Sequence, residues 1–197
     1  MRKKEGHKEQ DIIGAAIKVF GKKGFDGAKM HHIADTAGVG IGTVYLYFRN
    51  KEKILLRVFE VVWNDLYTIV STIKNNPEFS PMEKLDRLID NVFDYFAKNP
   101  EITIVLLNQH NYGDRSRKET PFQTMYVKTI AESELIIAEG QKTGVFNPSI
   151  STSFFQFFFF GGIRNSLLQW ANDSRKISIS ELRNNVKTVL TAGITAH

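Results

Sequence analysis

Apolar residues recur at three- and four-residue spacing along most of the chain, which is the pattern of helices that bury one face. Strand-like alternation of apolar and polar residues is not evident. We expect glycines to end two of the helices, Gly21 with Gly24 and Gly140 with Gly144. The pattern predicts an all-α protein of about nine helices, near residues 11–20, 30–37, 41–48, 51–74, 81–96, 102–107, 121–139, 151–170 and 180–194.

The segment 30–48 reads as two short helices joined by a glycine turn. In the first helix, Met30, Ile33, Ala34 and Ala37 form one apolar stripe, and Gly38-Val39-Gly40 ends it. Two helices joined in this way form a helix-turn-helix, whose second helix enters the major groove of DNA. The alternative is an ordinary helical hairpin in a bundle, but the Thr and Tyr residues of 41–48 would be an odd packing surface.

Charge is concentrated around this motif. The chain has a formal net charge of +5. Residues 1–53 hold eleven Lys and Arg against six Asp and Glu, a net of +5, and the remainder holds fifteen of each. Lysine-rich termini are usually solvated tails, but coincidence with a helix-turn-helix favours contact with phosphates.

The second helix offers groups suited to a DNA backbone. The hydroxyls of Thr43 and Tyr45 can donate to phosphate oxygens, which positions a helix without reading sequence. Lys51 can neutralise a phosphate, while Tyr47 and the backbone at 40–42 are expected near base edges. The helix has no Arg, Asn or Gln for bidentate base contact, so specificity would rest partly on thymine methyl groups and DNA shape.

The segments 24–25, 33–39 and 42–53 resemble the N-terminal domain of TetR-type transcriptional repressors. The resemblance implies an all-α homodimer with a three-helix DNA-binding domain, here residues 1–50, and a C-terminal domain that binds an inducer and dimerises, here 51–197. Lys29 departs from the family, which often has Thr or Ser there as helix N-cap, and it could reach a phosphate instead. The expected DNA contacts are Lys29, Met30, Gly40, Ile41, Gly42, Thr43, Tyr45, Leu46, Tyr47 and Lys51.

The segment 154–160 holds six Phe residues and is apolar nearly all round, so a helix there must be covered on most sides. We infer that it pairs, with the last helix, against the same helices of a second subunit. The alternative is a core helix of a monomer. The expected interface residues are Phe154, Phe155, Phe158, Leu182, Val186, Val189 and Leu190.

Aromatic residues in the C-terminal part suggest an apolar effector cavity, although each one is also a reasonable core residue. Arg164 follows the Phe cluster and needs an anionic partner, either a protein carboxylate or an acidic effector. The cluster Arg115, Arg117 and Lys118 is either a solvated edge or the mouth of the pocket. The expected pocket residues are Phe93, Phe96, Leu107, Asn108, His110, Tyr112, Phe122, Met125, Tyr126 and Arg164.

The segments 159–170 and 182–194 resemble TetR-type repressors of fatty-acid degradation, which respond to long-chain acyl-coenzyme A. We therefore expect a repressor that a small, largely apolar effector, including acyl-coenzyme A, releases from a palindromic operator in double-stranded DNA. The alternatives are a different hydrophobic or aromatic effector such as a drug, or a ligand-binding protein that does not bind DNA.

Other classes of function find little support. The chain has no cysteine, hence no disulfide framework, thiol nucleophile or Cys-based zinc site, which suits a cytoplasmic protein. An enzyme using His110, or a metal site at the adjacent His31 and His32, would need more converging groups than we find, since we expect the two imidazoles to point apart. We expect no cofactor and no metal. We also expect no membrane span, because the apolar run at 154–163 is too short to cross a bilayer.

Overall fold

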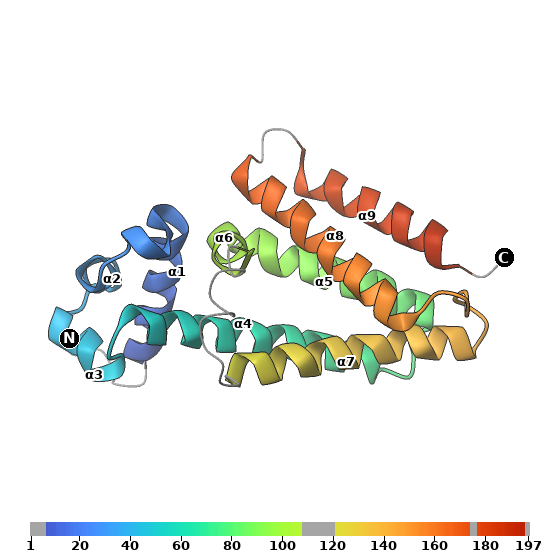
Figure 1. The fold of residues 1–197 in the computed structure, drawn as a ribbon, viewed down its shortest axis with the longest axis horizontal. Helices are drawn as coiled ribbons and strands as arrows, with labels where there is room; N and C mark the ends of the chain where they lie inside the picture. Colours follow the sequence, from blue (N-terminus) through green and yellow to red (C-terminus); the bar gives the residue numbers. More distant parts are fainter. Residues whose placement is uncertain (1–6, 108–120, 174–176, 196–197) are drawn as a thin grey trace. The chain divides into compact units, whose positions relative to one another are not determined.

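The computed structural model describes residues 7–107, 121–173 and 177–195 (Figure 1). Within them the chain is all α, with nine helices and no strand, so the predicted fold class is confirmed. No helix in these ranges is long and apolar enough to cross a membrane. The helices are α1 (Lys8–Gly27), α2 (Met30–Ala37), α3 (Ile41–Tyr47), α4 (Lys51–Lys74), α5 (Pro81–Lys98), α6 (Pro100–Leu107), α7 (Pro121–Lys142), α8 (Thr152–Asn172) and α9 (Ile179–Ile194).

The described residues form two compact units. Residues 7–62 and 101–107 make the first, which we call the head, and residues 63–100, 121–173 and 177–195 make the second, which we call the body. The change from head to body falls inside α4. That one helix therefore carries the chain from the first unit into the second, and the expected division after residue 50 stays a prediction.

The head is built around a small apolar core to which α1 to α4 each contribute. Ile12, Ile33, Val44 and Ile54, one from each helix, are fully buried. Gly38 ends α2 with a φ of 67° and donates its N–H to the carbonyls of the preceding turn. A left-handed residue at this position turns the chain sharply enough for α3 to start three residues later.

Gly21 does not end the first helix, contrary to the sequence-based expectation. α1 continues to Gly27, and only Gly24, with φ 68° and ψ 165°, leaves helical geometry. A Cβ at Gly21 would lie 2.7 Å from the Cβ of Glu101 on α6. The glycine therefore permits close approach of two helices of the head, a role that a sequence pattern cannot separate from helix termination.

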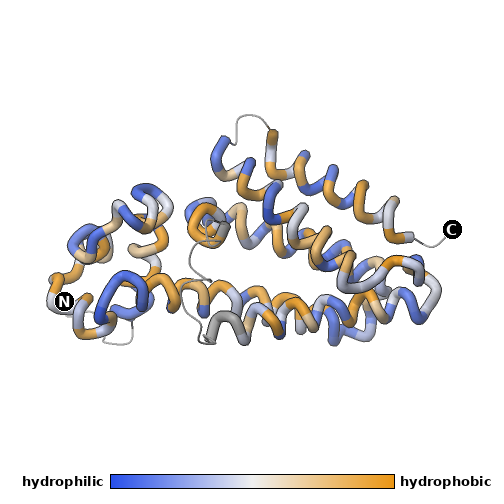
Figure 2. Tube along the Cα trace, in the orientation of Figure 1, coloured by the Kyte–Doolittle hydropathy of each residue, from blue (hydrophilic) through white to orange (hydrophobic). Residues whose placement is uncertain are grey.

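In the body, α5 packs against both α7 and α9, and α8 packs against α7 and α9. Figure 2 shows hydrophobic and hydrophilic positions alternating along α5 and α7, as helices buried on one face require. Three N-caps fix the helix starts, since the hydroxyls of Ser80, Ser151 and Ser178 each accept a backbone N–H of the first turn. Fully buried side chains in this core include Phe93, Ile136, Phe146, Leu167 and Ile194.

Gly140 likewise lies inside a helix and does not end it. α7 runs on to Lys142, and the left-handed residue is Gly144, with a φ of 74°. A Cβ at Gly140 would overlap the ring of Phe146, which is completely buried. The chain returns over α7 at this point, and the glycine provides the space for that ring.

Ion pairs link the body helices. Lys84 of α5, only 4% exposed, donates to both carboxylate oxygens of Glu139 on α7 at 2.9 and 2.8 Å. Lys187 of α9 contacts Asp86 and Asp90 of α5, each at 2.8 Å. α5 is thereby tied to both of its neighbours by charge as well as by apolar packing.

Candidate nucleic-acid interface

The helix α3 presents an exposed surface that is mostly apolar and aromatic. Val44 and Phe48 anchor the helix in the head core, while Ile41, Tyr45, Leu46 and Tyr47 are exposed. Leu46 is 85% exposed. A large aliphatic side chain held this far into water on a well-anchored helix is typical of a binding surface.

The other expected contacts lie at the starts of α2 and α3. Gly40 is the N-cap of α3, and its carbonyl accepts the N–H of Thr43 at 2.8 Å. At Gly40 and Gly42 an added Cβ would meet nothing within 4 Å, so nothing described in the chain itself requires a glycine there. Lys29 is exposed and Met30 is half-buried at the start of α2. All of these positions belong to the helix-turn-helix itself.

Lys51, at the start of α4, has partners within the head. Its Nζ donates to the carbonyls of Phe25 at 2.8 Å, and of Asp26 and Ala28 at 3.2 Å each. The ammonium also lies 4.5 Å from the centre of the Phe25 ring. A phosphate contact would require it to leave these carbonyls, so that role remains a prediction, while its part in holding the α1–α2 turn is observed.

The N-cap of α2 is unusual. The Lys29 side chain makes no capping bond, as expected for a group that cannot accept a hydrogen bond. Instead, the Lys29 backbone N–H donates to Nδ1 of His32 at 3.3 Å. An accepting Nδ1 places the proton of the neutral imidazole on Nε2. His32 therefore supplies half of a capping box in place of the usual Glu or Gln.

The surroundings of His32 disfavour protonation of its ring. Reduced hydration of the ring lowers its pKa, and so do Lys23, His31 and Lys29, whereas Asp35 opposes them. The expectation that His31 and His32 point apart was wrong, because their ring centroids lie 4.3 Å apart, edge to face. No group of three or more His, Cys, Asp or Glu side chains suited to a metal occurs in the described parts of the chain.

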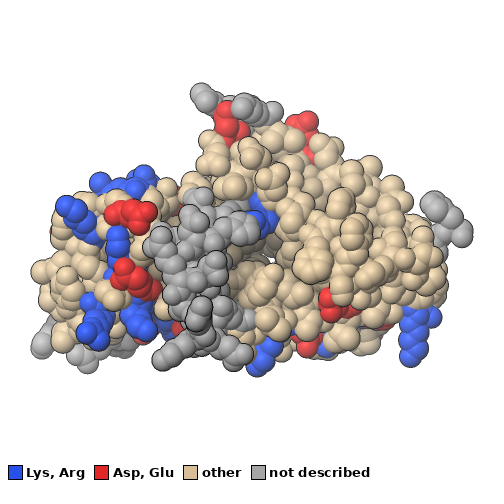
Figure 3. Space-filling view, viewed as in Figure 1, with Lys and Arg blue, Asp and Glu red and all other residues tan. Residues whose placement is uncertain are grey.

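Lys and Arg side chains gather on the head, as Figure 3 shows. The visible surface over α8 and α9 in the same view carries few charges. The gathered Lys and Arg side chains and the surface with few charges (Figure 3) thus belong to different units of the chain.

The expected effector pocket is only partly described. Phe93 and Phe96 are buried in the body core, Met125 and Arg164 are half-buried, and Tyr126 is exposed. The side chains of Leu107 and Phe122, and residues Asn108, His110, Tyr112, Arg115, Arg117 and Lys118, lie outside the described part of the chain.

The indole N–H of Trp63 is a buried hydrogen-bond donor of the body that we did not single out from the sequence. Its ring centroid lies 4.8 Å from that of Tyr126, edge to face, and its buried Nε1 has no hydrogen-bond acceptor among the described residues. It continues the apolar stripe of α4, and nothing in the sequence distinguishes it from a core residue.

The expected dimer residues fall into three groups. Phe154, Phe158 and Val189 are exposed, Leu182 and Val186 are half-buried, and Phe155 and Leu190 are buried inside the protomer. Phe157, which we did not expect, is the most exposed of the cluster at 80%. A hollow of about 150 Å³ opens on α8 and α9 between Ile150, Phe154, Phe155, Phe158, Val189, Leu190 and Gly193.

A helical head that contains a helix-turn-helix with an exposed second helix, followed by an all-helical body, is typical of a DNA-binding regulator. Residues 12–58 match the family model described as "Bacterial regulatory proteins, tetR family", and residues 81–158 match "Tetracyclin repressor-like, C-terminal domain". The chain therefore belongs to the TetR family of transcriptional regulators, and the resemblance seen in its sequence is confirmed.

One curated relative and two solved structures extend over nearly the whole chain. The "Fatty acid metabolism regulator protein" of Bacillus subtilis (strain 168) is 29% identical over 196 residues, 98% of each chain. The structure of the fatty acid degradation regulator FadR from Bacillus halodurans has a TM-score of 0.82 at 25% identity, covering 96% of this chain and 97% of that one. The transcriptional regulator FadR from Bacillus subtilis, in complex with stearoyl-CoA, has a TM-score of 0.77 at 26% identity, covering 94% and 98%.

Proposed function

We propose that this regulator is a cytoplasmic, homodimeric repressor that binds a palindromic operator and is released by a long-chain acyl-coenzyme A. The observation that carries the DNA-binding part is the exposed surface of α3, held by Val44 and Phe48 within the positively charged head. These exposed side chains lie outside the buried core of the head. The major groove of DNA is wide enough to admit a helix that presents them.

On this proposal the head reads DNA mainly by shape and apolar contact. Leu46 and Ile41 would meet thymine methyl groups, and the hydroxyl of Tyr45 would donate to a phosphate. Tyr47 and the glycine backbone at 40–42 would lie near base edges. Lys29 and Lys51 would add charge, so that affinity falls with rising salt.

Dimerisation would place two heads on one operator. Phe154, Phe157 and Phe158 of α8 and Val189 of α9 form an exposed apolar face, which a second copy of the chain would bury. Two-fold symmetry then matches the symmetry of a palindromic site, with half-sites spaced by about one helical turn or a multiple of it.

The effector class rests on the relative bound to stearoyl-CoA and on the aromatic body of this chain. A long acyl chain suits a cavity lined by apolar side chains such as Phe93 and Phe96. The buried Trp63 Nε1 is a donor that an acyl thioester oxygen could satisfy, and the half-buried Arg164 carries a charge that would attract a phosphate. A drug or another aromatic effector would use the same apolar groups without needing a cation.

Release requires the effector to bind the DNA-free arrangement more tightly than the DNA-bound one. α4 is the element suited to carry that preference, because it begins at the Lys51 contacts in the head and ends in the body. A shift of α4 would pull directly on the carbonyls of the α1–α2 turn.

DNA binding is tested by selecting duplexes from a random pool with the full chain. We expect an enriched inverted repeat whose affinity falls steeply between 50 and 200 mM salt. A matched selection with Leu46→Asp, which changes a side chain with no role in the head core, should enrich nothing. Failure of the unaltered chain to enrich any sequence would refute the repressor assignment.

The effector is tested by native mass spectrometry of the purified chain. A dimer whose mass exceeds twice 22.5 kDa by that of an acyl-coenzyme A supports both the dimer and the ligand class. A dimer that binds an added aromatic drug but not added stearoyl-CoA would favour the second effector class.

A further inference from the structure

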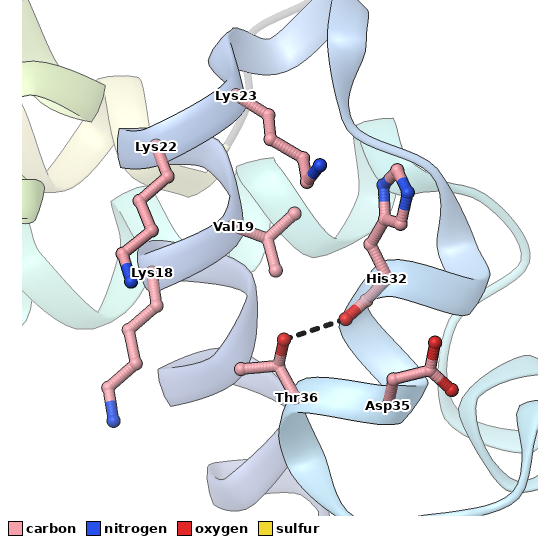
Figure 4. Close-up of a pocket in the computed structure, with 7 residues that line it drawn as sticks. All are labelled: Lys18, Val19, Lys22, Lys23, His32, Asp35 and Thr36. Atoms are coloured by element: carbon pink, nitrogen blue, oxygen red, sulfur yellow. Dashed lines mark hydrogen bonds between the residues drawn. The ribbon is translucent and has the colours of Figure 1, made fainter.

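A hollow of about 260 Å³ lies between α1 and α2 in the head. None of the residues lining it belongs to the expected DNA contacts. In Figure 4, Lys18 and Lys22 extend along one side of α1, and Lys23 extends toward the ring of His32. The lining residues are Lys18, Val19, Lys22, Lys23, His32, Asp35 and Thr36.

The hollow carries excess positive charge. Lys18, Lys22 and Lys23 are exposed, and none of them takes part in the ion pairs found between described residues. Asp35 is the single acid in the lining and is itself exposed. Three ammonium groups thus share one rim with one carboxylate, an arrangement that attracts a multivalent anion.

His32 adds a directional donor. Its Nδ1 is occupied as the acceptor of the Lys29 N–H, so the neutral ring must carry its proton on Nε2. The Thr36 hydroxyl donates to the His32 carbonyl at 2.8 Å, which fixes the same turn of α2 on which the ring stands. The lining therefore offers one oriented N–H beside three mobile ammonium groups.

We propose that this hollow is a phosphate-binding site, filled by a phosphate group that accepts hydrogen bonds from Nε2 of His32 and from the ammonium group of Lys23, while Lys18 and Lys22 on the other side of α1 (Figure 4) add positive charge. A phosphate has several strong acceptor oxygens and up to two negative charges, which suits an imidazole N–H surrounded by three ammonium groups better than a single carboxylate does. A volume of about 260 Å³ leaves room for a phosphate that belongs to a larger molecule. That molecule is either a small phosphate ester or the backbone of bound DNA.

The site gives His32 a second function. A phosphate oxygen on Nε2 makes Nδ1 a better acceptor, which strengthens the bond to the Lys29 N–H at the start of α2. The anion also favours protonation of the ring, which takes place at Nδ1 and ends the bond from Lys29, so we expect occupancy to raise the pKa of His32 from its lowered value. The ring is therefore both a ligand and a reporter of binding.

The test titrates inorganic phosphate into the full chain at constant ionic strength and follows the His32 imidazole signals by NMR, assigned with His32→Gln. We expect a saturable shift and a higher apparent pKa for His32. In Lys18→Gln/Lys22→Gln/Lys23→Gln the affinity should fall about tenfold. Asp35→Asn should tighten binding, which no loss of folding can imitate.

The matched control is Lys98→Gln/Lys128→Gln/Lys142→Gln, which removes three exposed lysines from the body and changes the net charge equally. This control should bind phosphate like the unaltered chain. A shift that does not saturate, or an equally weakened affinity in both triple variants, overturns the site.

A second arm identifies the source of the phosphate and uses a random-sequence duplex of about two helical turns. If the DNA backbone fills the hollow, saturating duplex should abolish the response of His32 to phosphate. In that case Lys18→Gln/Lys22→Gln/Lys23→Gln should lower the salt slope of DNA binding. We expect a decrease of about 0.9 for each backbone phosphate that has lost its lysine partner. If a small phosphate ester fills it, the response should persist on DNA with an unchanged slope. Both results support the site, and failure to bind any DNA would refute the repressor assignment while leaving the phosphate titration interpretable.

Discussion

Replacing Lys51 by methionine separates two roles for one residue. The change keeps the aliphatic stem and removes the ammonium, which donates to three carbonyls at 2.8, 3.2 and 3.2 Å and lies over the Phe25 ring. Hydrogen bonds from a charged donor contribute roughly 1.5–3 kcal/mol each. The two longer bonds are weaker, and the exposed Asp26 carbonyl can rehydrate, so we expect the head to lose about 2 kcal/mol.

Hydrogen exchange of the α1 and α2 amides measures this loss without assuming that head and body unfold together. A loss of about 2 kcal/mol corresponds to a roughly thirtyfold drop in protection. Lys53→Met is the matched control, because Lys53 is exposed two residues further along α4, and it should change protection by less than about 0.5 kcal/mol. Equal protection in both variants would refute the holding role. A drop of about 0.9 in the salt slope of DNA binding, with head protection unchanged, would instead make Lys51 a phosphate contact.

Four further changes test other parts of the account. Tyr47→Ala should weaken operator binding at least about tenfold and leave the dimer intact in sedimentation; an unaltered dissociation constant would remove it from the interface. Phe157→Asp should yield folded monomers, since the ring is 80% exposed within the protomer; a stable dimer would place the interface elsewhere. Gly140→Ala should destabilise the body by at least about 1–3 kcal/mol in urea unfolding, because its Cβ overlaps Phe146; a neutral effect would contradict that packing. The pKa of His32 is lowered in the folded chain, so the unfolded chain binds the proton more readily, and the stability of the head should decline as pH falls below about 6.5. His32→Gln should remove this decline, and an unchanged pH profile would exclude His32 as its source.

The helix-turn-helix could be predicted closely from sequence because its signals are local. The apolar stripe of α2 and the turn at Gly38 follow from spacing and backbone freedom alone, and the structure places α2 at Met30–Ala37 as predicted. The N-cap at Lys29 was correctly expected to lack a side-chain bond. We did not expect the His32 side chain to accept the Lys29 N–H in place of a Glu or Gln. A His at the third position of the helix could have indicated this role.

Roles that depend on distant partners could not be predicted. Lys51 contacts carbonyls 23 to 26 residues away, and only packing shows that its ammonium faces the head. The Phe-rich helix is apolar nearly all round, so its periodicity does not say which rings face outward. Phe155 is buried and Phe157 is exposed because α7 and α9 cover particular sides of α8.

The most direct test of the repressor assignment uses a fluorescent duplex carrying the selected operator, bound by the full chain and titrated with stearoyl-CoA. We predict that the anisotropy falls to that of free DNA, while stearate or coenzyme A alone has little effect at the same concentration. Retention of the complex when stearoyl-CoA is shown by native mass spectrometry to saturate the dimer would contradict release by acyl-coenzyme A.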